Sequence, residues 1–208
     1  MAFNYPLMLD VSTRRIVIIG GGKVAARKAK LLLDCGATQL RVIAPSFHSE
    51  LPESVEKIAG TYLPHHLDGA QLVFAATDRA EVNDQVVRDA HERGVLVCRA
   101  DGSEETSGDF VTPALLREGA IGVTISAGSP ALATMVRDEL AKRWDPRWTK
   151  MGNAMQTMRP MILSSALSPQ ERTEVFRELA TQEALQVLEA EGVEGVIRWL
   201  IARHPTLA

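Results

Sequence analysis

The sequence has few of the features that mark a disulfide-bonded, metal-binding or nucleic-acid-binding protein. Its two cysteines, Cys35 and Cys98, are too far apart for a CxxC pair, so neither a disulfide framework nor a zinc site is expected. A net charge of −3 gives no general attraction to nucleic acid or to an anionic membrane. Aromatic residues make up only 5% of the chain, but 46% of its 208 residues are hydrophobic, which is typical of a globular protein.

Long apolar runs are also missing. No run approaches the roughly 20 residues that a membrane-spanning helix requires. The first residues, MAFNYPLMLD, include an acid and have no basic stretch before a long apolar run, which distinguishes them from a signal peptide. We therefore expect a cytoplasmic protein with reduced cysteines and with neither nucleic-acid nor membrane partners.

The first hundred residues alternate between strand and helix patterns. The apolar, β-branched run Arg15–Ile19 predicts a strand buried on both faces. Segments 23–34 and 81–93 predict amphipathic helices, which glycines end at positions 36 and 94. Further strands are expected at residues 40–44, 61–63, 72–76 and 95–98. This alternation predicts an α/β domain of the Rossmann type, with a parallel sheet and right-handed crossovers.

The pattern changes after Cys98. Two extended segments, 110–116 and 121–126, flank Glu118-Gly119 and predict a hairpin. Ser129-Pro130 predicts the start of a helix, and the later residues give only helical signals, with a break at Gly192. We predict three parts: a dinucleotide-binding domain at 1–112, a hairpin and helix segment at 113–147, and a small helical domain at 148–208.

A glycine motif lies between the first predicted strand and the first predicted helix. Gly20-Gly21-Gly22-Lys23-Val24-Ala25 fits G-x-G-x-x-[GA]. The first glycine allows a tight turn, and Gly22 lets the backbone approach a pyrophosphate; Ala25 permits close packing of helix on strand. The free N–H groups and the dipole of the helix N-terminus favour phosphate. The motif predicts dinucleotide binding rather than a purely structural turn. It lacks the GK[ST] of nucleoside triphosphatases, because Val24 follows Lys23.

One element common at such sites is absent. The strand 40–44 leads into Pro45-Ser46, without the acid that usually binds the adenosine ribose. No arginine is present there to hold a 2′-phosphate. Ser46 and the local backbone must serve instead, and NAD is favoured over NADP.

Longer motifs make the chain similar to a known family, the dehydrogenase module of siroheme synthase. Members of that family are precorrin-2 dehydrogenases, and some are also sirohydrochlorin ferrochelatases. The resemblance covers nearly all of residues 1–140, whereas the later residues match only as helical. The motifs that carry it are Tyr5-Pro6-Leu7, GGGKVAARKAKLLLDCGA at Gly20–Ala37, VIAP at Val42–Pro45, AATD at Ala75–Asp78 followed by Asn83, DFVTPALLREGAIGVTIS at Asp109–Ser126, and SPALA at Ser129–Ala133.

The resemblance implies a specific reaction. Precorrin-2, a reduced tetrapyrrole with eight carboxylates, is oxidised to sirohydrochlorin, and NAD⁺ accepts the hydride. The family also implies a homodimer joined through segment 113–147. The glycine motif and the resemblance together give the residues expected to contact NAD. They are Gly20, Gly21, Gly22, Lys23, Val24, Pro45, Ser46, Thr77 and Asp78. No resident metal is expected.

The family's acid–base aspartate follows the last strand of the sheet, and Asp101 is the match, with Asp109 as the alternative. Whether this residue removes a proton or orients the substrate is left open. Arg99 replaces the family's usual asparagine, and the loop after Asp101 differs in length. Arg99, Arg117 and Arg137 are expected to bind substrate carboxylates, since arginine suits bidentate recognition. The alternative for each arginine is a solvated surface charge or a dimer contact.

Three functions are compatible with the sequence. The first is a dehydrogenase alone. The second also inserts ferrous iron into sirohydrochlorin, which the acidic loop at 99–109 favours. The third is a non-catalytic NAD- or tetrapyrrole-binding protein, which the altered loop after Asp101 favours.

The pair His65-His66 predicts a surface feature rather than a metal site, because adjacent side chains on an extended chain point to opposite sides.

Overall fold

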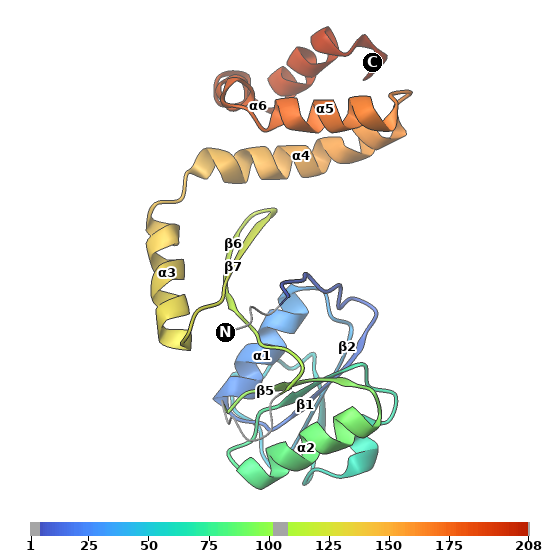
Figure 1. The fold of residues 1–208 in the computed structure, drawn as a ribbon, viewed down its shortest axis with the longest axis vertical. Coiled ribbons are helices and arrows are strands. Elements are labelled where there is room, and N and C mark those ends of the chain that lie inside the picture. The colour runs from blue at the N-terminus through green and yellow to red at the C-terminus, as the bar shows by residue number, and fades with distance from the viewer. Residues whose placement is uncertain (1–4, 102–107, 208) are drawn as a thin grey trace. The chain divides into compact units, whose positions relative to one another are not determined.

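The computed structural model describes residues 5–101 and 108–207, and the chain divides into two compact units, residues 1–112 and 113–208. In the described part of the first unit, a parallel five-stranded sheet lies between two helices (Figure 1). The predicted Rossmann-type sheet is confirmed. Its strands follow the order β3-β2-β1-β4-β5. The elements are β1 (Arg15–Ile19), α1 (Lys23–Asp34), β2 (Gln39–Ala44), β3 (Glu56–Ala59), the 3₁₀ turn η1 (Pro64–Leu67), β4 (Leu72–Ala75), α2 (Ala80–Glu92) and β5 (Leu96–Arg99).

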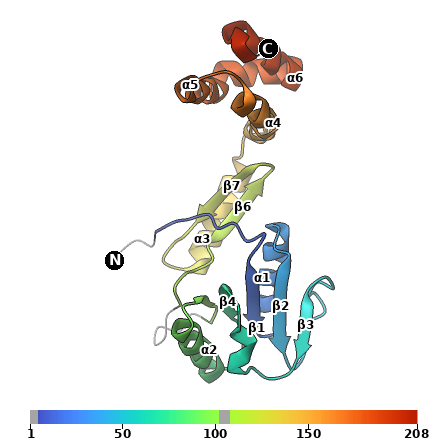
Figure 2. The ribbon, with the colours of Figure 1, turned by 90° about the vertical axis from the view of Figure 1, so that its right-hand side faces the viewer.

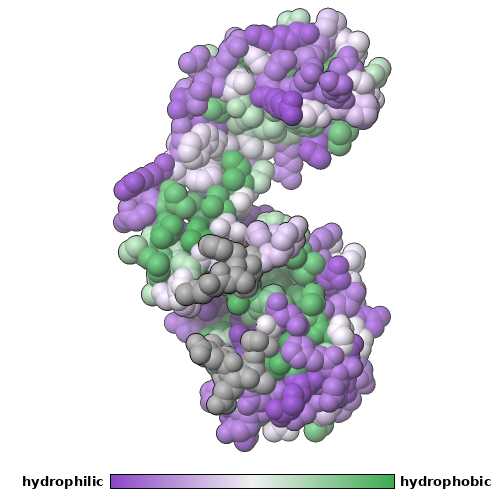
Figure 3. All heavy atoms as spheres, in the orientation of Figure 1, coloured by the Kyte–Doolittle hydropathy of each residue, from purple (hydrophilic) through white to green (hydrophobic). Residues whose placement is uncertain are grey.

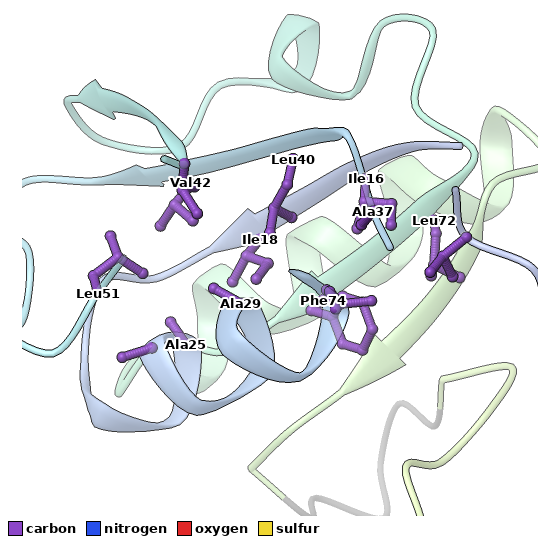
Figure 4. Close-up of a cluster of buried hydrophobic side chains, with 14 of the residues drawn as sticks. Ile16, Ile18, Ala25, Ala29, Ala37, Leu40, Val42, Leu51, Leu72 and Phe74 are labelled. Carbon is purple, nitrogen blue, oxygen red and sulfur yellow. The ribbon is translucent and has the colours of Figure 1, made fainter. Parts of the chain in front are cut away.

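The two faces of the sheet are covered by different helices. Successive residues of a strand point to opposite faces. In β1, Ile18 lies in one buried cluster with Ala29 of α1 (Figure 4), whereas Val17 lies in another with Val86 of α2. Both faces are therefore out of water, which is why the central strands are continuous apolar runs in the sequence.

The third strand was predicted at the wrong place. We expected it at residues 61–63, but β3 is Glu56–Ala59, at the edge of the sheet beside β2 (Figure 2). Within β3 only Ile58 is partly buried, and the other residues are exposed. A short edge strand with one partly buried residue shows neither an apolar run nor an alternating pattern. Residues 61–63 instead lead into the 3₁₀ turn η1.

A buried lysine lies between α1 and the sheet. Lys28 is 8% exposed, and its ammonium lies 4.9 Å from the centre of the Phe74 ring. Its Nζ donates a hydrogen bond to Thr112 Oγ1 (3.0 Å) and lies 3.9 Å from Cys98 Sγ. Burial lowers the pKa of Lys28 and raises that of the Cys98 thiol. Lys28 therefore connects α1 to the last residue of the first unit.

The second unit begins with the predicted hairpin, followed by helices. The antiparallel strands β6 and β7 are joined at Gly119, whose φ of +60° suits glycine. As predicted, Ser129 lies at the start of α3, where its Oγ accepts the N-cap hydrogen bond from Leu132 N (3.2 Å). Ser168 begins a capping box at the start of α5. The elements are β6 (Ala114–Glu118), β7 (Ile121–Ile125), α3 (Pro130–Lys142), α4 (Pro146–Ser164), α5 (Pro169–Leu179), α6 (Gln182–Arg203) and the 3₁₀ turn η2 (Pro205–Leu207).

The last three helices share one core. Met158 of α4, Val175 of α5 and Leu200 of α6 are buried together. The predicted break at Gly192 is confirmed, because its φ of +68° and ψ of −166° interrupt the helical path of α6. Of the helices in residues 5–101 and 108–207, none combines the length and the apolar character needed to cross a membrane.

Candidate functional site

The strand order creates a topological switch point in the first unit. From β1 the chain adds β2 and β3 on one side of the sheet, and then crosses to add β4 and β5 on the other side. The loops that follow β1 and β4 therefore leave the sheet in opposite directions. Open α/β sheets bind ligands outside the carboxyl ends of their strands at this point.

The predicted cofactor residues follow the carboxyl ends of neighbouring strands. Ile19, the last residue of β1, is paired with Ile43 of β2 and Ala75 of β4, and Ala75 is paired with Arg99 of β5. These strand ends form one continuous edge. The segments that begin there are Gly20–Val24 after β1, Pro45–Ser46 after β2, Thr77–Asp78 after β4 and Asp101 after β5. The fold thus brings the predicted cofactor residues and Asp101 to one edge of the sheet.

Gly20 and Gly21 are required by the fold itself. Gly20 has a φ of +119°, and a Cβ there would overlap the carbonyl oxygen of Ala76. A Cβ on Gly21 would overlap the carbonyl oxygen of Ser46. His48 N donates to the Gly21 carbonyl (2.7 Å). These two glycines therefore let the loops after β2 and β4 close against the turn.

Gly22 is different, because the fold does not require a glycine there. Its φ of −79° and ψ of −173° suit any residue, and a Cβ would meet no atom within 4 Å. Gly22 is the N-cap of α1, whose first backbone N–H groups have no partner within the helix. A missing side chain at this position leaves space for another molecule to approach those N–H groups.

The N-terminus of α1 carries positively charged side chains, which destabilise a helix at that end. Its first turn has no acidic residue and begins with Lys23, and Arg27 follows one turn later. The helix dipole disfavours cations at the N-terminus, and like charges four residues apart repel. A bound anion would offset both effects. Beside this turn lies a cavity of about 550 Å³, lined by Lys23, Val24, Ala26, Arg27, Lys30 and Glu50.

Asp101 is held by two side chains at the same edge of the sheet. The fully buried Asn83 of α2 donates from Nδ2 to Asp101 Oδ2 (2.8 Å) and to the Thr77 carbonyl (3.1 Å). Thr77 N donates in return to Asn83 Oδ1 (3.1 Å). Arg99 forms a fork to Asp101, from Nε to Oδ1 (2.6 Å) and from Nη2 to Oδ2 (3.0 Å). Asn83 thus connects the loop after β4 to the aspartate after β5.

Arg99 is engaged with acids of its own unit. Its side chain is 3% exposed, and its Nη1 pairs with Asp84 of α2. Hydrogen bonding to Asp101, and then to Asp84, raises the pKa of the Arg99 guanidinium. The guanidinium thus pairs with two carboxylates of the first unit. That Arg99 binds substrate stays a prediction.

The roles of Asn83 and Asp84 were missed from sequence. One signal for Asn83 was present, because it lies on the same face of α2 as the buried residues Val86, Val87 and Ala90. A polar side chain on an otherwise apolar helix face needs a buried hydrogen-bond partner. Asp84 gave no comparable signal.

Asp109, the alternative to Asp101, lies toward the amino ends of the strands. Its Oδ2 accepts a hydrogen bond from Val97 N (2.8 Å), near the start of β5. Its Oδ1 lies 3.1 Å from Nε2 of His91, in the last turn of α2. Since α2 runs back from the carboxyl ends of the strands, these contacts place Asp109 away from the glycine turn.

The other candidates lie on other elements of the fold. Arg117 is on β6 and Arg137 is on α3, where it pairs with Asp138 (2.6 Å). His65 and His66 lie in η1, with ring centres 4.5 Å apart. Within residues 5–101 and 108–207, no group of three or more His, Cys, Asp or Glu side chains is arranged to hold a metal ion.

Comparison with known proteins places the first unit in a family. The NAD_binding_7 family model, described as NAD(P)-binding, matches residues 7–114. Siroheme synthase from Chromobacterium violaceum is 39% identical over 143 residues, which cover 65% of this chain and 30% of that protein. Siroheme synthase from Azotobacter vinelandii is 40% identical over 148 residues, which cover 68% of this chain and 31% of that protein. The chain thus matches less than a third of the length of these relatives.

A solved structure shares the fold. SirC, a precorrin-2 dehydrogenase, matches 95% of this chain with a TM-score of 0.76, and the match covers 98% of SirC. The two sequences are 22% identical, so this likeness concerns the fold. It extends beyond the sheet to the hairpin and the helices that follow.

Proposed function

This chain belongs to the NAD_binding_7 family of NAD(P)-binding proteins, and we propose that it is an NAD-dependent precorrin-2 dehydrogenase, which oxidises precorrin-2 to sirohydrochlorin in siroheme synthesis. The observation that carries the proposal is Gly22, a glycine at the switch point that the fold does not require. The similarity to siroheme synthases and to SirC supports the choice of substrate. A net charge of −3 and two free cysteines fit a cytoplasmic enzyme without nucleic-acid or membrane partners.

The residues at the carboxyl edge fit a dinucleotide. The N–H groups that follow Gly22 would bind the diphosphate, and Lys23 adds a positive charge beside it. Pro45 and Ser46 would hold the adenosine end, where no acid is available for the ribose. Thr77 and Asp78 would line the site on the β4 side. When bound, NAD⁺ supplies the hydride acceptor.

Asp101 would act on the substrate beside the cofactor. It follows β5, the strand next to β4, and Asn83 links it to Thr77. Oxidation of the macrocycle removes a hydride and a proton, so the protein must orient the reacting carbon toward the cofactor. Arg117 and Arg137 remain candidates for binding substrate carboxylates.

The proposal is tested by turnover. The purified chain, given precorrin-2 and NAD⁺, is expected to form NADH and sirohydrochlorin in equal amounts, and less product with NADP⁺. A second reaction, of sirohydrochlorin with ferrous ion, tests for ferrochelatase activity above the uncatalysed rate. Tight binding of NAD⁺ and tetrapyrrole without turnover would contradict the proposal and favour a non-catalytic binding protein.

We also propose that the chain is a homodimer joined through the hairpin and α3. Three large apolar side chains of α3 are exposed: Leu132 (45%), Met135 (56%) and Leu140 (42%). Apolar residues gather on the surface over this helix (Figure 3). Exposed apolar patches mark interfaces. A second copy of the chain would cover these side chains.

A charge on this surface is expected to separate the subunits. Met135→Glu should weaken the dimer by at least about 100-fold, because an unpaired carboxylate would be buried at a cost of about 3 kcal/mol. Sedimentation velocity across a range of concentrations measures the effect. Thr134→Glu adds the same charge at an exposed position outside the apolar row and should leave the dimer unchanged. A wild-type chain that is monomeric throughout would refute this proposal.

A further inference from the structure

The contacts of Asp101 are unlike those of a general base. Its two oxygens accept at least three hydrogen bonds, two from the fork of Arg99 and one from Asn83 Nδ2. An opposite charge and hydrogen bonds to both oxygens favour the ionised form of a carboxyl group. A carboxylate stabilised in this way is a weak proton acceptor near neutral pH.

The side chains that hold Asp101 are themselves fixed. Arg99 lies between Asp101 and Asp84, whose side chains are 25% and 26% exposed, whereas its own is 3% exposed. Asn83 is fully buried and bound to Thr77 through both ends of its amide. The direction of the Asp101 carboxylate is therefore set by β5, by α2 and by the loop after β4.

We propose that Arg99 is a positioning residue that keeps Asp101 ionised and fixes its direction. Asp101 then acts on the substrate as a fixed negative charge and hydrogen-bond acceptor, not as the base that removes the proton. This inference rests on the proposed dehydrogenase function and assigns the role that the sequence left open. With NAD⁺ bound as the hydride acceptor, the C–H bond of the reacting carbon would lose its hydride to the cofactor, and the accompanying proton would pass to water rather than to Asp101.

Removing Arg99 and removing Asp84 change the charge beside Asp101 in different ways. Arg99 and the two aspartates together carry one net negative charge. Without Arg99, the two carboxylates would face each other, and like charges at short range make one of them easier to protonate. Without Asp84, the pair of Arg99 and Asp101 would remain.

The test compares Arg99→Asn, Arg99→Lys and Asp84→Asn with the wild type. For each, kcat/KM is measured from about pH 5 to pH 9, a range above the ordinary ionisation of aspartate. In the wild type and in Asp84→Asn, kcat/KM should not fall toward low pH within this range, so the profile has no acid limb. In Arg99→Asn, an acid limb should appear within this range, because Asp101 becomes easier to protonate. Arg99→Lys keeps the charge but not the fork, so its limb should lie at lower pH than that of Arg99→Asn, while kcat falls about tenfold. NAD⁺ affinity should stay within about twofold of wild type in every variant.

A second readout does not depend on turnover. NMR of the Asp101 carboxyl carbon should show it ionised from neutral pH down to about pH 4 in the wild type, and protonating at a higher pH in the Arg99 variants. A wild-type Asp101 that protonates near neutral pH would overturn the inference, as would Arg99 variants whose pH profile and kcat match the wild type. If the wild type binds NAD⁺ but does not oxidise precorrin-2, the proposed function fails, and the NMR titration still decides whether Arg99 keeps Asp101 ionised.

Discussion

Replacing Gly22 with aspartate is expected to abolish NAD⁺ binding without weakening the fold. A Cβ at this position meets no atom within 4 Å, and the backbone conformation suits any residue. Aspartate is also a better N-cap than glycine, so α1 should gain a few tenths of a kcal/mol. The added carboxylate, however, would occupy the space through which a diphosphate reaches the helix N–H groups, and it would repel that diphosphate. NAD⁺ affinity should fall by at least about 100-fold, or about 3 kcal/mol.

Calorimetric titration with NAD⁺ and thermal unfolding measure the two effects separately. Gly22→Asn adds similar bulk without charge, so it should cost less affinity than Gly22→Asp. The matched control is Gly128→Asp, since Gly128 also has space for a Cβ and lies in the second unit. That control should bind NAD⁺ as the wild type does. Full affinity in Gly22→Asp would mean that the diphosphate lies elsewhere.

Replacing Asp101 with asparagine is expected to lower kcat by about 10²–10³-fold. Asparagine keeps the size of the side chain but removes the negative charge, and losing one preorganised electrostatic contact to a transition state costs this much. NAD⁺ affinity should change by no more than about threefold, because the diphosphate contacts the turn after β1. Steady-state turnover of precorrin-2, together with calorimetry for NAD⁺, measures both quantities.

Asp109→Asn is the matched control for Asp101→Asn. Asp109 bonds to Val97 N and His91, toward the amino ends of the strands. The control should keep kcat within about threefold of wild type, while the free energy of unfolding falls by about 1 kcal/mol or less as a partly buried hydrogen bond weakens. Loss of turnover in Asp109→Asn, with turnover retained in Asp101→Asn, would show that the two aspartates were assigned the wrong way round.

The first unit was largely predictable because its central strands are buried on both faces. The runs at β1 and β4 are apolar for that reason, and the glycines between elements set their ends. The strand β3 was not predictable, since it is an exposed edge whose residues satisfy no periodic pattern. A hydrophobic pattern in the sequence reflects burial, and most residues of β3 are exposed.

The site was predictable where it depends on backbone conformation and less so where it depends on tertiary contacts. The glycine turn could be recognised because close approach requires glycine at fixed spacing. The pairing of Arg99 with Asp84 joins β5 to α2 across 15 positions, a separation with no sequence signature. The sequence therefore did not indicate that Arg99 pairs with two aspartates.

The central claim is that the backbone N–H groups following Gly22 bind the diphosphate of NAD. A crystal structure of the chain with NAD⁺ tests it most directly. We predict diphosphate oxygens within hydrogen-bond distance of the backbone nitrogens of Lys23 or Val24, with the adenosine toward Ser46. A structure in which NAD⁺ is bound while this turn contacts no phosphate would contradict the account.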